Sequence, residues 1–189
     1  MARSEIKIGG FGGQGVILSG YILGRAASIF DNKNATMIQA FGPEARGSAT
    51  SAQLIISDEP ITYPYLVSPS VMVLMSQEAY SKFSPELAPG GTLLTEEDLV
   101  ATHNLRSDVK HRSIPATRFA EELGKRLVLN IVMLGFMTAI TNVVGREAAR
   151  NAVKVSVPKG TEELNFAAFE KGYEYGLQML RPEPEKSLV

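Results

Sequence analysis

The first thirty residues change from strand-like to helix-like hydrophobic patterning. Polar and apolar residues alternate over 5–8 and lead into seven residues, 9–15, of which five are glycine. From Val16 to Ile29 the apolar residues recur at helical spacing, which predicts an amphipathic helix. This opening segment therefore predicts a strand, a glycine loop and a helix.

Four further segments have the pattern of strands. A turn-rich stretch, 31–34, precedes the first of them and Gly42-Pro43 follows it, so we expect it to complete a β-α-β unit with the opening segment. The apolar run at 71–75 is typical of a strand that is covered on both faces. The four predicted strands are Asn34–Phe41, Ser51–Ile56, Val71–Met75 and Thr92–Thr95.

The second half of the chain has helical patterning. Phe119, Leu123 and Leu127 are four residues apart, which predicts a helix, and helices are also expected at 131–140, 146–155 and 162–180. In the last helix Phe169, Tyr173 and Leu177 share one stripe, which we interpret as core packing. Prolines at 182 and 184 should end that helix.

Strands that alternate with helices and then give way to helices indicate an α/β protein. We expect a three-layer α/β/α architecture around a largely parallel or mixed central sheet, with a Rossmann-like start. The 189 residues suffice for one domain, assigned to 1–180, and residues 181–189 are expected to form a flexible tail.

Composition narrows the possible functions. The formal net charge is −1, so the protein as a whole has no positive electrostatic field that would hold nucleic acid. The longest apolar segment, 127–140, is short and contains Asn130, so no membrane span is expected. Without a secretory signal pattern, the expected location is the cytoplasm.

The chain has no cysteine, which excludes disulfides and cysteine-ligated clusters. We interpret His103 and His111 as solvated loop residues and expect no metal site.

The glycine loop is the first candidate for binding chemistry. The segment Gly10-Phe11-Gly12-Gly13-Gln14-Gly15 fits GxGxxG between a strand and a helix that begins at Val16. Such a loop lets the backbone approach a ligand, and the free N–H groups at a helix start favour an anion. We therefore predict that Gly10, Gly12, Gly13, Gln14, Gly15 and Val16 bind a cofactor. The alternative is that the glycines only permit close packing of helix on sheet.

A nicotinamide site is not supported, because the second strand ends in Gln39-Ala40-Phe41-Gly42 without the acidic residue that binds ribose. Asp31 comes too early, and Glu44 lies beyond a Gly-Pro. No GxxxxGK[ST] segment indicates a P-loop nucleotidase.

The second candidate is the loop 42–48, which we expect at the same rim of the sheet as the glycine loop. Pro43 and Gly47 should fix its shape, while Glu44 and Arg46 bring charge, Arg46 as a planar fork suited to carboxylate or phosphate. These four residues are predicted to form an interface or an active-site lid, although both charges could instead be solvated. Asn130 is also assigned to the interface or active-site lid. It would either fix a nearby backbone loop or cap the start of a helix, and we expect the cap.

Three motifs in order resemble one known family. They are Gly10-Phe11-Gly12-Gly13-Gln14-Gly15-Val16, Gly42-Pro43-Glu44-Ala45-Arg46-Gly47 and Leu129-Asn130-Ile131-Val132-Met133-Leu134-Gly135. Together they are similar to the gamma subunits of 2-oxoacid:ferredoxin or acceptor oxidoreductases, and most of all to those of the 2-oxoglutarate enzymes. The pyruvate, branched-chain 2-oxoacid and indolepyruvate enzymes are near relatives.

The resemblance implies an EC 1.2.7 type of complex that converts 2-oxoglutarate and coenzyme A to succinyl-CoA and carbon dioxide and passes electrons to ferredoxin or flavodoxin. It further implies that alpha, beta and delta subunits are partners and hold thiamine diphosphate, magnesium and iron–sulfur clusters. This chain would have no catalytic residue and no activity alone, but would support assembly, active-site closure and possible coenzyme A binding. A purely structural interaction subunit is the alternative.

Overall fold

A computed structural model describes residues 3–41 and 49–181 of the chain. In chain order the elements are β1 (Arg3–Phe11), α1 (Val16–Arg25), a π-helical turn η1 (Ala26–Phe30), β2 (Asn34–Ala40), β3 (Ala49–Ser57), β4 (Val71–Leu74), α2 (Gln77–Phe83), a 3-10 turn η2 (Ser84–Glu86), β5 (Thr92–Glu96), β6 (Lys110–Ile114), α3 (Ala116–Glu122), a 3-10 turn η3 (Arg126–Val128), α4 (Leu129–Thr141), α5 (Arg146–Ser156) and α6 (Glu162–Leu180).

The strands form one mixed sheet in the order β2-β3-β1-β4-β5-β6. Strands β1, β4, β5 and β6 are parallel, whereas β3 is antiparallel to both β1 and β2. The α/β fold class is therefore confirmed. The predicted β-α-β unit is split, because β3 lies between β1 and β2. Strand β3 is buried along nearly its whole length, as suits an interior position, whereas β2 has partly and fully exposed residues, as suits an edge.

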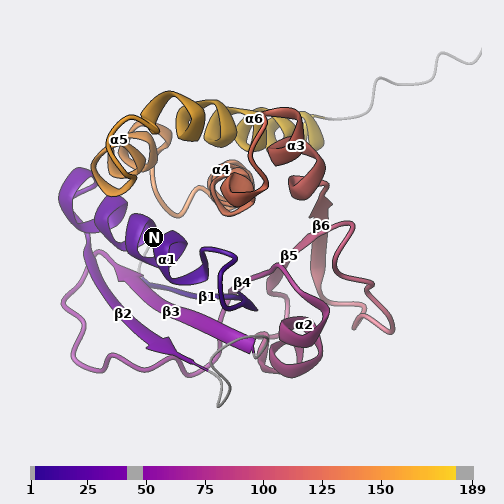
Figure 1. The fold of residues 1–189 in the computed structure, drawn as a ribbon. Helices are drawn as coiled ribbons and strands as arrows, with labels where there is room; N and C mark the ends of the chain where they lie inside the picture. Colours follow the sequence, from indigo (N-terminus) through magenta and orange to yellow (C-terminus); the bar gives the residue numbers. More distant parts are fainter. Residues whose placement is uncertain (1–2, 42–48, 182–189) are drawn as a thin grey trace, which may run out of the picture.

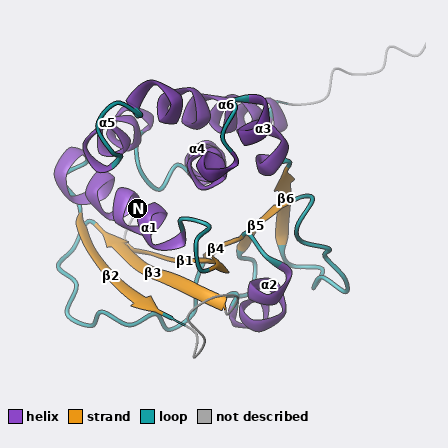
Figure 2. Cartoon of the chain, in the orientation of Figure 1, coloured by secondary structure: helices purple, strands orange, loops and turns teal. Residues whose placement is uncertain are grey.

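Helices cover both faces of the sheet, but unequally. Helices α1 and α3 to α6 lie on one face, and α2 lies alone on the other (Figures 1 and 2). The all-apolar strand β4 divides its side chains between the two layers: Val71 and Val73 pack toward α4, and Met72 and Leu74 pack toward α2. The unbroken apolar run in the sequence thus corresponds to a strand covered on both faces, as predicted.

Helices α4 and α6 cross at unusually close range. A Cβ atom on Gly135 would overlap the Phe169 carbonyl oxygen, and one on Gly172 would overlap the Val132 carbonyl oxygen. The two backbones can therefore meet only because neither residue has a side chain. Helix α4 is buried on almost every side as a result.

Two sequence-based expectations are wrong in the second half. The helix expected to continue through Leu127 ends at Glu122, because Gly124 adopts a positive φ of 86° and redirects the chain into η3. Leu127 is consequently 78% exposed. In α6, Phe169 is fully buried and Tyr173 is partly buried, but Leu177 is exposed, so only the first part of the expected stripe packs in the core.

His111 is not a solvated loop residue. It lies on β6, a strand that the sequence pattern did not indicate, and its Nε2 is 2.9 Å from Thr95 Oγ1. Burial and the nearby positive charge of Arg112 lower the pKa of His111, which favours the neutral ring in this contact. Strand β6 contains Lys110, His111 and Arg112 because it is an edge strand, where polar side chains reach solvent. His103 is exposed in a loop, as expected.

No helix in the described ranges 3–41 and 49–181 is both long enough and apolar enough to cross a bilayer.

We predict that Gly172→Ala lowers the free energy of unfolding by about 1–3 kcal/mol, because the added methyl group forces α4 and α6 apart. Urea unfolding of the full chain measures this change. Gly24→Ala is the matched control: its Cβ would make only an ordinary contact with Leu54, so we expect about 0.5–1 kcal/mol of stabilisation from higher helix propensity. Equal effects of the two substitutions would contradict the glycine crossing.

Candidate functional site

The glycine loop connects the carboxyl end of β1 to the start of α1, as the sequence predicted (Figure 1). Gly13 and Gly15 have φ values of 99° and 74°, which other residues rarely adopt. Helix α1 begins directly after Gly15 without a side-chain cap. The first-turn N–H groups of α1 are therefore left for solvent or for a ligand.

Gln14 holds the loop from inside. Its Oε1 accepts a hydrogen bond from the Phe11 N–H at 2.6 Å, and its Nε2 donates to the Met75 carbonyl at 2.9 Å. A Cβ on Gly10 would stand 2.6 Å from the same Oε1, so Gly10 is the residue that makes room for this amide. Both ends of the Gln14 amide are thus engaged within the chain, and its contribution to a bound cofactor would be to fix the loop.

Asn130 holds the loop from the helical layer. It is buried, and its Nδ2 donates to the Gly15 carbonyl and to Ser19 Oγ, each at 3.3 Å. The expectation that Asn130 caps a helix start is wrong, since α4 begins without any side-chain cap. The other expected use, fixing a nearby loop, corresponds to the observed contacts. Because Asn130 lies in the interior, it would influence an interface or lid only through this loop.

The exposed part of the loop is its tip. Gly12 and Gly13 are exposed, and a Cβ on Gly13 would meet no heavy atom within 4 Å. Within the described part of the chain, the backbone N–H groups of Gly12, Gly13 and Gly15 have no hydrogen-bond acceptor. Val16 is buried, so only its backbone could reach a ligand. The tip of the loop, Gly12 and Gly13, therefore presents amide hydrogens and no side chain.

A groove of about 270 Å³ runs beside the tip. Gly13 and Gln14 line one side of it, and Arg126, Leu127 and residues near them line the other. Arg126 is exposed, and its guanidinium is 3.9 Å from Glu121. Arg126 was not among the residues predicted from sequence, because no motif contains it. The signal that could have found it is Gly124, which ends α3 and starts the turn toward the glycine loop.

A buried carboxylate, that of Glu96, fixes the turn that brings Leu99 to the groove. Glu96, at the end of β5, accepts hydrogen bonds from the N–H groups of Leu99 at 2.6 Å and Thr117 at 3.0 Å. Leu99 lines the groove, and Thr117 lies in the first turn of α3. Glu96 therefore positions the turn and the helix and is not free to act on a ligand.

Pro43, Glu44, Arg46 and Gly47 lie outside the described residues. The residues that flank them are at the expected edge of the sheet: Ala49 pairs with Phe11, at the end of β1, and Phe41 follows β2. Phe41 is 67% exposed. An apolar side chain is thus exposed after the end of β2, two strands away from β1.

The carboxylate of Asp31, which was excluded as a ribose ligand, is used structurally. Its Oδ2 accepts a hydrogen bond from the Gly145 N–H at 2.6 Å, at the start of α5. Within the described ranges no group of three or more potential metal-ligating residues is found. Among the described residues, the carboxyl edge offers amide hydrogens, apolar surface and Arg126, which has Glu121 3.9 Å away. Amide hydrogens and a cation beside apolar surface suit an organic anion.

Comparison with known proteins extends this description. The model of the family described as "Pyruvate ferredoxin/flavodoxin oxidoreductase" matches residues 5–175. The 2-oxoglutarate synthase subunit KorC of Methanocaldococcus jannaschii is 50% identical over 179 residues, which cover 94% of this chain and 96% of that protein. The gamma subunit of a keto/oxoacid ferredoxin oxidoreductase from Geobacter sulfurreducens is 40% identical, with a TM-score of 0.85, over 94% of this chain and 98% of that chain.

A larger structure shares the fold. The 2-oxoglutarate:ferredoxin oxidoreductase from Magnetococcus marinus, solved with 2-oxoglutarate, coenzyme A and succinyl-CoA bound, has a TM-score of 0.84 at 20% identity. The match covers 96% of this chain and 32% of that chain. The same fold therefore also occurs as one part of a longer polypeptide.

The contact between Gly15 and Asn130 can be tested by a double-mutant cycle. Asn130→Ala removes the two hydrogen bonds that Asn130 Nδ2 donates, to Ser19 Oγ and to the Gly15 carbonyl, which keeps the Ser19 N–H as a donor, and should cost about 1–3 kcal/mol. Gly15→Ala places a methyl group 2.5 Å from Asn130 Nδ2 and should also destabilise. The double variant removes the overlap, so we expect its loss to be smaller than the sum by about 0.5–3 kcal/mol, measured by urea unfolding.

Gly13→Ala is the control for this cycle, because it adds φ strain of about 1–2 kcal/mol without a steric neighbour. It should combine additively with Asn130→Ala. Additive losses for Gly15→Ala and Asn130→Ala as well would show that the two residues do not constrain each other.

Proposed function

Because the chain belongs to the pyruvate ferredoxin/flavodoxin oxidoreductase family, we propose that it is the gamma subunit of a 2-oxoglutarate:acceptor oxidoreductase complex. The reaction is the conversion of 2-oxoglutarate and coenzyme A to succinyl-CoA and carbon dioxide, with electrons passed to ferredoxin or flavodoxin. Half of the aligned residues are shared with the archaeal KorC relative over nearly the full length of both chains, and this is the observation that carries the proposal.

The redox and decarboxylation groups would be bound by alpha, beta and delta subunits. The absence of cysteine excludes a cysteine-ligated iron–sulfur cluster in this chain. The described residues also contain no carboxylate and histidine cluster suited to the magnesium of thiamine diphosphate. The residues present therefore do not fit those groups.

Coenzyme A is the group that the exposed residues fit. Its phosphates would be held by the unpaired N–H groups of Gly12 and Gly13, by the start of α1 and by Arg126. A helix start contributes about 0.3–1 kcal/mol to binding an exposed anion, and up to about 2 kcal/mol when it is partly buried. Leu99 and Leu127 offer apolar surface beside this anion site. When bound, coenzyme A supplies the thiol that accepts the acyl group.

In this proposal the chain binds coenzyme A and holds it in a fixed orientation. Gln14 and Asn130 hold the loop in one shape, so its N–H groups are aligned before a ligand arrives. Pre-organised donors bind an anion without a further ordering cost. We further propose that residues 43–47 and Asn130 serve the contact with the catalytic subunits and the closure of their active site.

The second candidate is a structural interaction subunit. Phe41 and Leu127 are large apolar residues that are exposed, Leu127 in the groove beside the glycine loop and Phe41 after the end of β2, which favours a contact surface for another subunit. In that case the glycines would serve packing alone. A pyruvate, branched-chain 2-oxoacid or indolepyruvate specificity of the same complex is a further alternative, because substrate choice would lie with the partner subunits.

A coenzyme A titration of the reconstituted complex tests the proposed anion site. We expect Arg126→Gln and Gly13→Val each to raise the KM for coenzyme A about tenfold. The first removes a charge-assisted hydrogen bond, and the second forces a β-branched residue into a φ of 99°, which would turn the N–H at position 13 out of place. The KM for 2-oxoglutarate and the elution volume of the complex should not change. Lys154→Gln, an exposed substitution on α5, is the matched control.

The outcome separates the two functions. Release of the subunit by Arg126→Gln, with normal coenzyme A kinetics in whatever complex remains, would favour the structural role. An unchanged KM for coenzyme A in both variants would remove coenzyme A from the glycine loop.

A further inference from the structure

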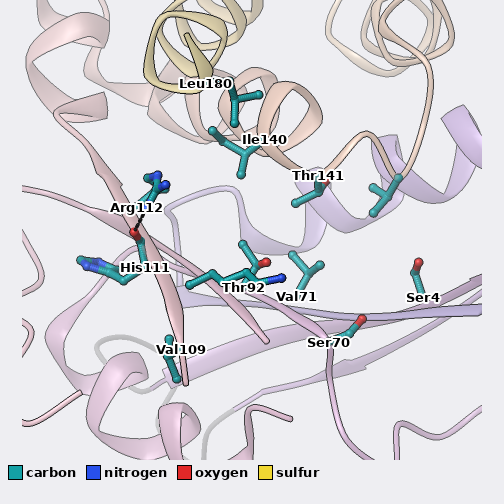
Figure 3. Close-up of a pocket in the computed structure, with 12 residues that line it drawn as sticks. Ser4, Ser70, Val71, Thr92, Val109, His111, Arg112, Ile140, Thr141 and Leu180 are labelled. Carbon is teal, nitrogen blue, oxygen red and sulfur yellow. Dashed lines mark hydrogen bonds between the residues drawn. The ribbon is translucent and has the colours of Figure 1, made fainter. Parts of the chain in front are cut away.

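A larger hollow lies at the amino ends of the parallel strands, opposite to the strand ends that carry the glycine loop (Figure 3). We call it the amino-edge pocket. It has a volume of about 640 Å³, and its floor is formed by the first residues of β1, β4, β5 and β6. Helices α4 and α6 end above it, at Thr141 and Leu180, so the helical layer stops before it covers these strand ends.

The walls of the pocket are chemically asymmetric. Figure 3 shows Ile140 and Leu180 on the helical side of the hollow, above Thr92, with Val71 beside Thr92 on the strand side. Arg112 lies on one side and Ser4 on the other, in keeping with the positions of β6 and β1 in the sheet. An apolar middle between a cationic end and a hydroxyl end suits an elongated ligand with a charged head and an aliphatic body.

The charge of the pocket is positive. Among the described residues, its lining includes Lys110 and Arg112 but no aspartate or glutamate. Within the ranges 3–41 and 49–181 neither side chain forms an ion pair, and the hydrogen bond that Arg112 donates goes to the His111 carbonyl at 2.9 Å. Arg118 and Arg146, in contrast, each pair with a carboxylate elsewhere on the surface. Two cations therefore open onto the hollow without a neutralising partner among these residues.

The ends of α4 and α6 oppose this charge only weakly. A helix carboxyl end carries about half of a negative elementary charge, located on its last carbonyl groups. Near the pocket, the Met137 carbonyl already accepts from Thr141 Oγ1 at 2.7 Å, and the Val143 carbonyl accepts from Lys33 Nζ at 3.0 Å. The full charges of Lys110 and Arg112 therefore dominate.

We propose that the amino-edge pocket binds a small aliphatic carboxylate. The carboxylate pairs with Arg112, whose planar guanidinium matches its two oxygens, and with Lys110, while the aliphatic body lies between Val71 and Ile140. A phosphate group is disfavoured here, because two helices present their carboxyl ends and no helix start supplies amide donors. The pocket is at the other edge of the sheet from the glycine loop, so this site does not depend on the proposed function.

Methyl NMR of the full chain with three probes tests the proposal. Hexanoate should shift the methyl signals of Val71, Ile140, Val143 and Leu180 in a saturable way. 1-Hexanol, which has the body without the charge, and acetate, which has the charge without the body, should each bind at least about tenfold more weakly. Equal affinity for hexanoate and 1-hexanol, or hexanoate shifts confined to other methyl groups, would overturn the site.

Substitutions in the pocket test whether Arg112 is the group that binds the carboxylate. Arg112→Gln, on an exposed edge strand, should weaken hexanoate binding about tenfold with an unchanged melting temperature. Ile140→Phe enlarges the side chain that faces the aliphatic body and should weaken hexanoate binding, and a far-UV spectrum checks that this variant folds. Lys154→Gln is the matched control and should bind as the natural chain does. If Arg112→Gln and Lys154→Gln bind hexanoate equally well, the pocket does not recognise a carboxylate.

Discussion

The structure depends on keeping a loop of glycines in one shape while its N–H groups stay unpaired at the surface. Glycine has the largest conformational freedom to lose on folding, so such a loop does not hold itself. Two amide side chains supply the missing order. Gln14 ties the loop to Met75 at the end of the sheet, and Asn130 ties it to the helical layer. The position of the loop is thereby fixed relative to both layers of the domain.

The position of Asn130 depends in turn on how α4 packs. This helix is buried on almost all sides, and it approaches α6 through Gly135 and Gly172 at a distance that no side chain would allow. Any increase in that distance would displace α4 and with it the amide that holds Gly15. Packing far from the surface therefore controls the geometry of the exposed N–H groups, which is how a small binding element obtains a rigid support.

The two ends of the parallel strands, the carboxyl edge and the amino edge of the sheet, differ in the groups that they present to a ligand. At the carboxyl edge the helix start of α1 and Arg126 provide amide donors and one cation. At the amino edge α4 and α6 present their carboxyl ends, and among the described lining residues Lys110 and Arg112 provide the positive charge. The first arrangement suits phosphate, and the second suits a carboxylate with an aliphatic body.

Local sequence determined the order of strand, glycine loop and helix, the buried strand β4 and the α/β class, because hydrophobic periodicity and glycine content act over a few residues. Tertiary structure decided the rest. Strand β6 carries Lys110 and Arg112 and has no apolar period, so only its pairing with β5 makes it a strand. Arg126 lies more than a hundred residues from Gly13, and Asn130 looks like a helix cap until α4 is placed against the loop. These contacts come from the packing of elements far apart in the chain, and no pattern within a short window encodes such packing.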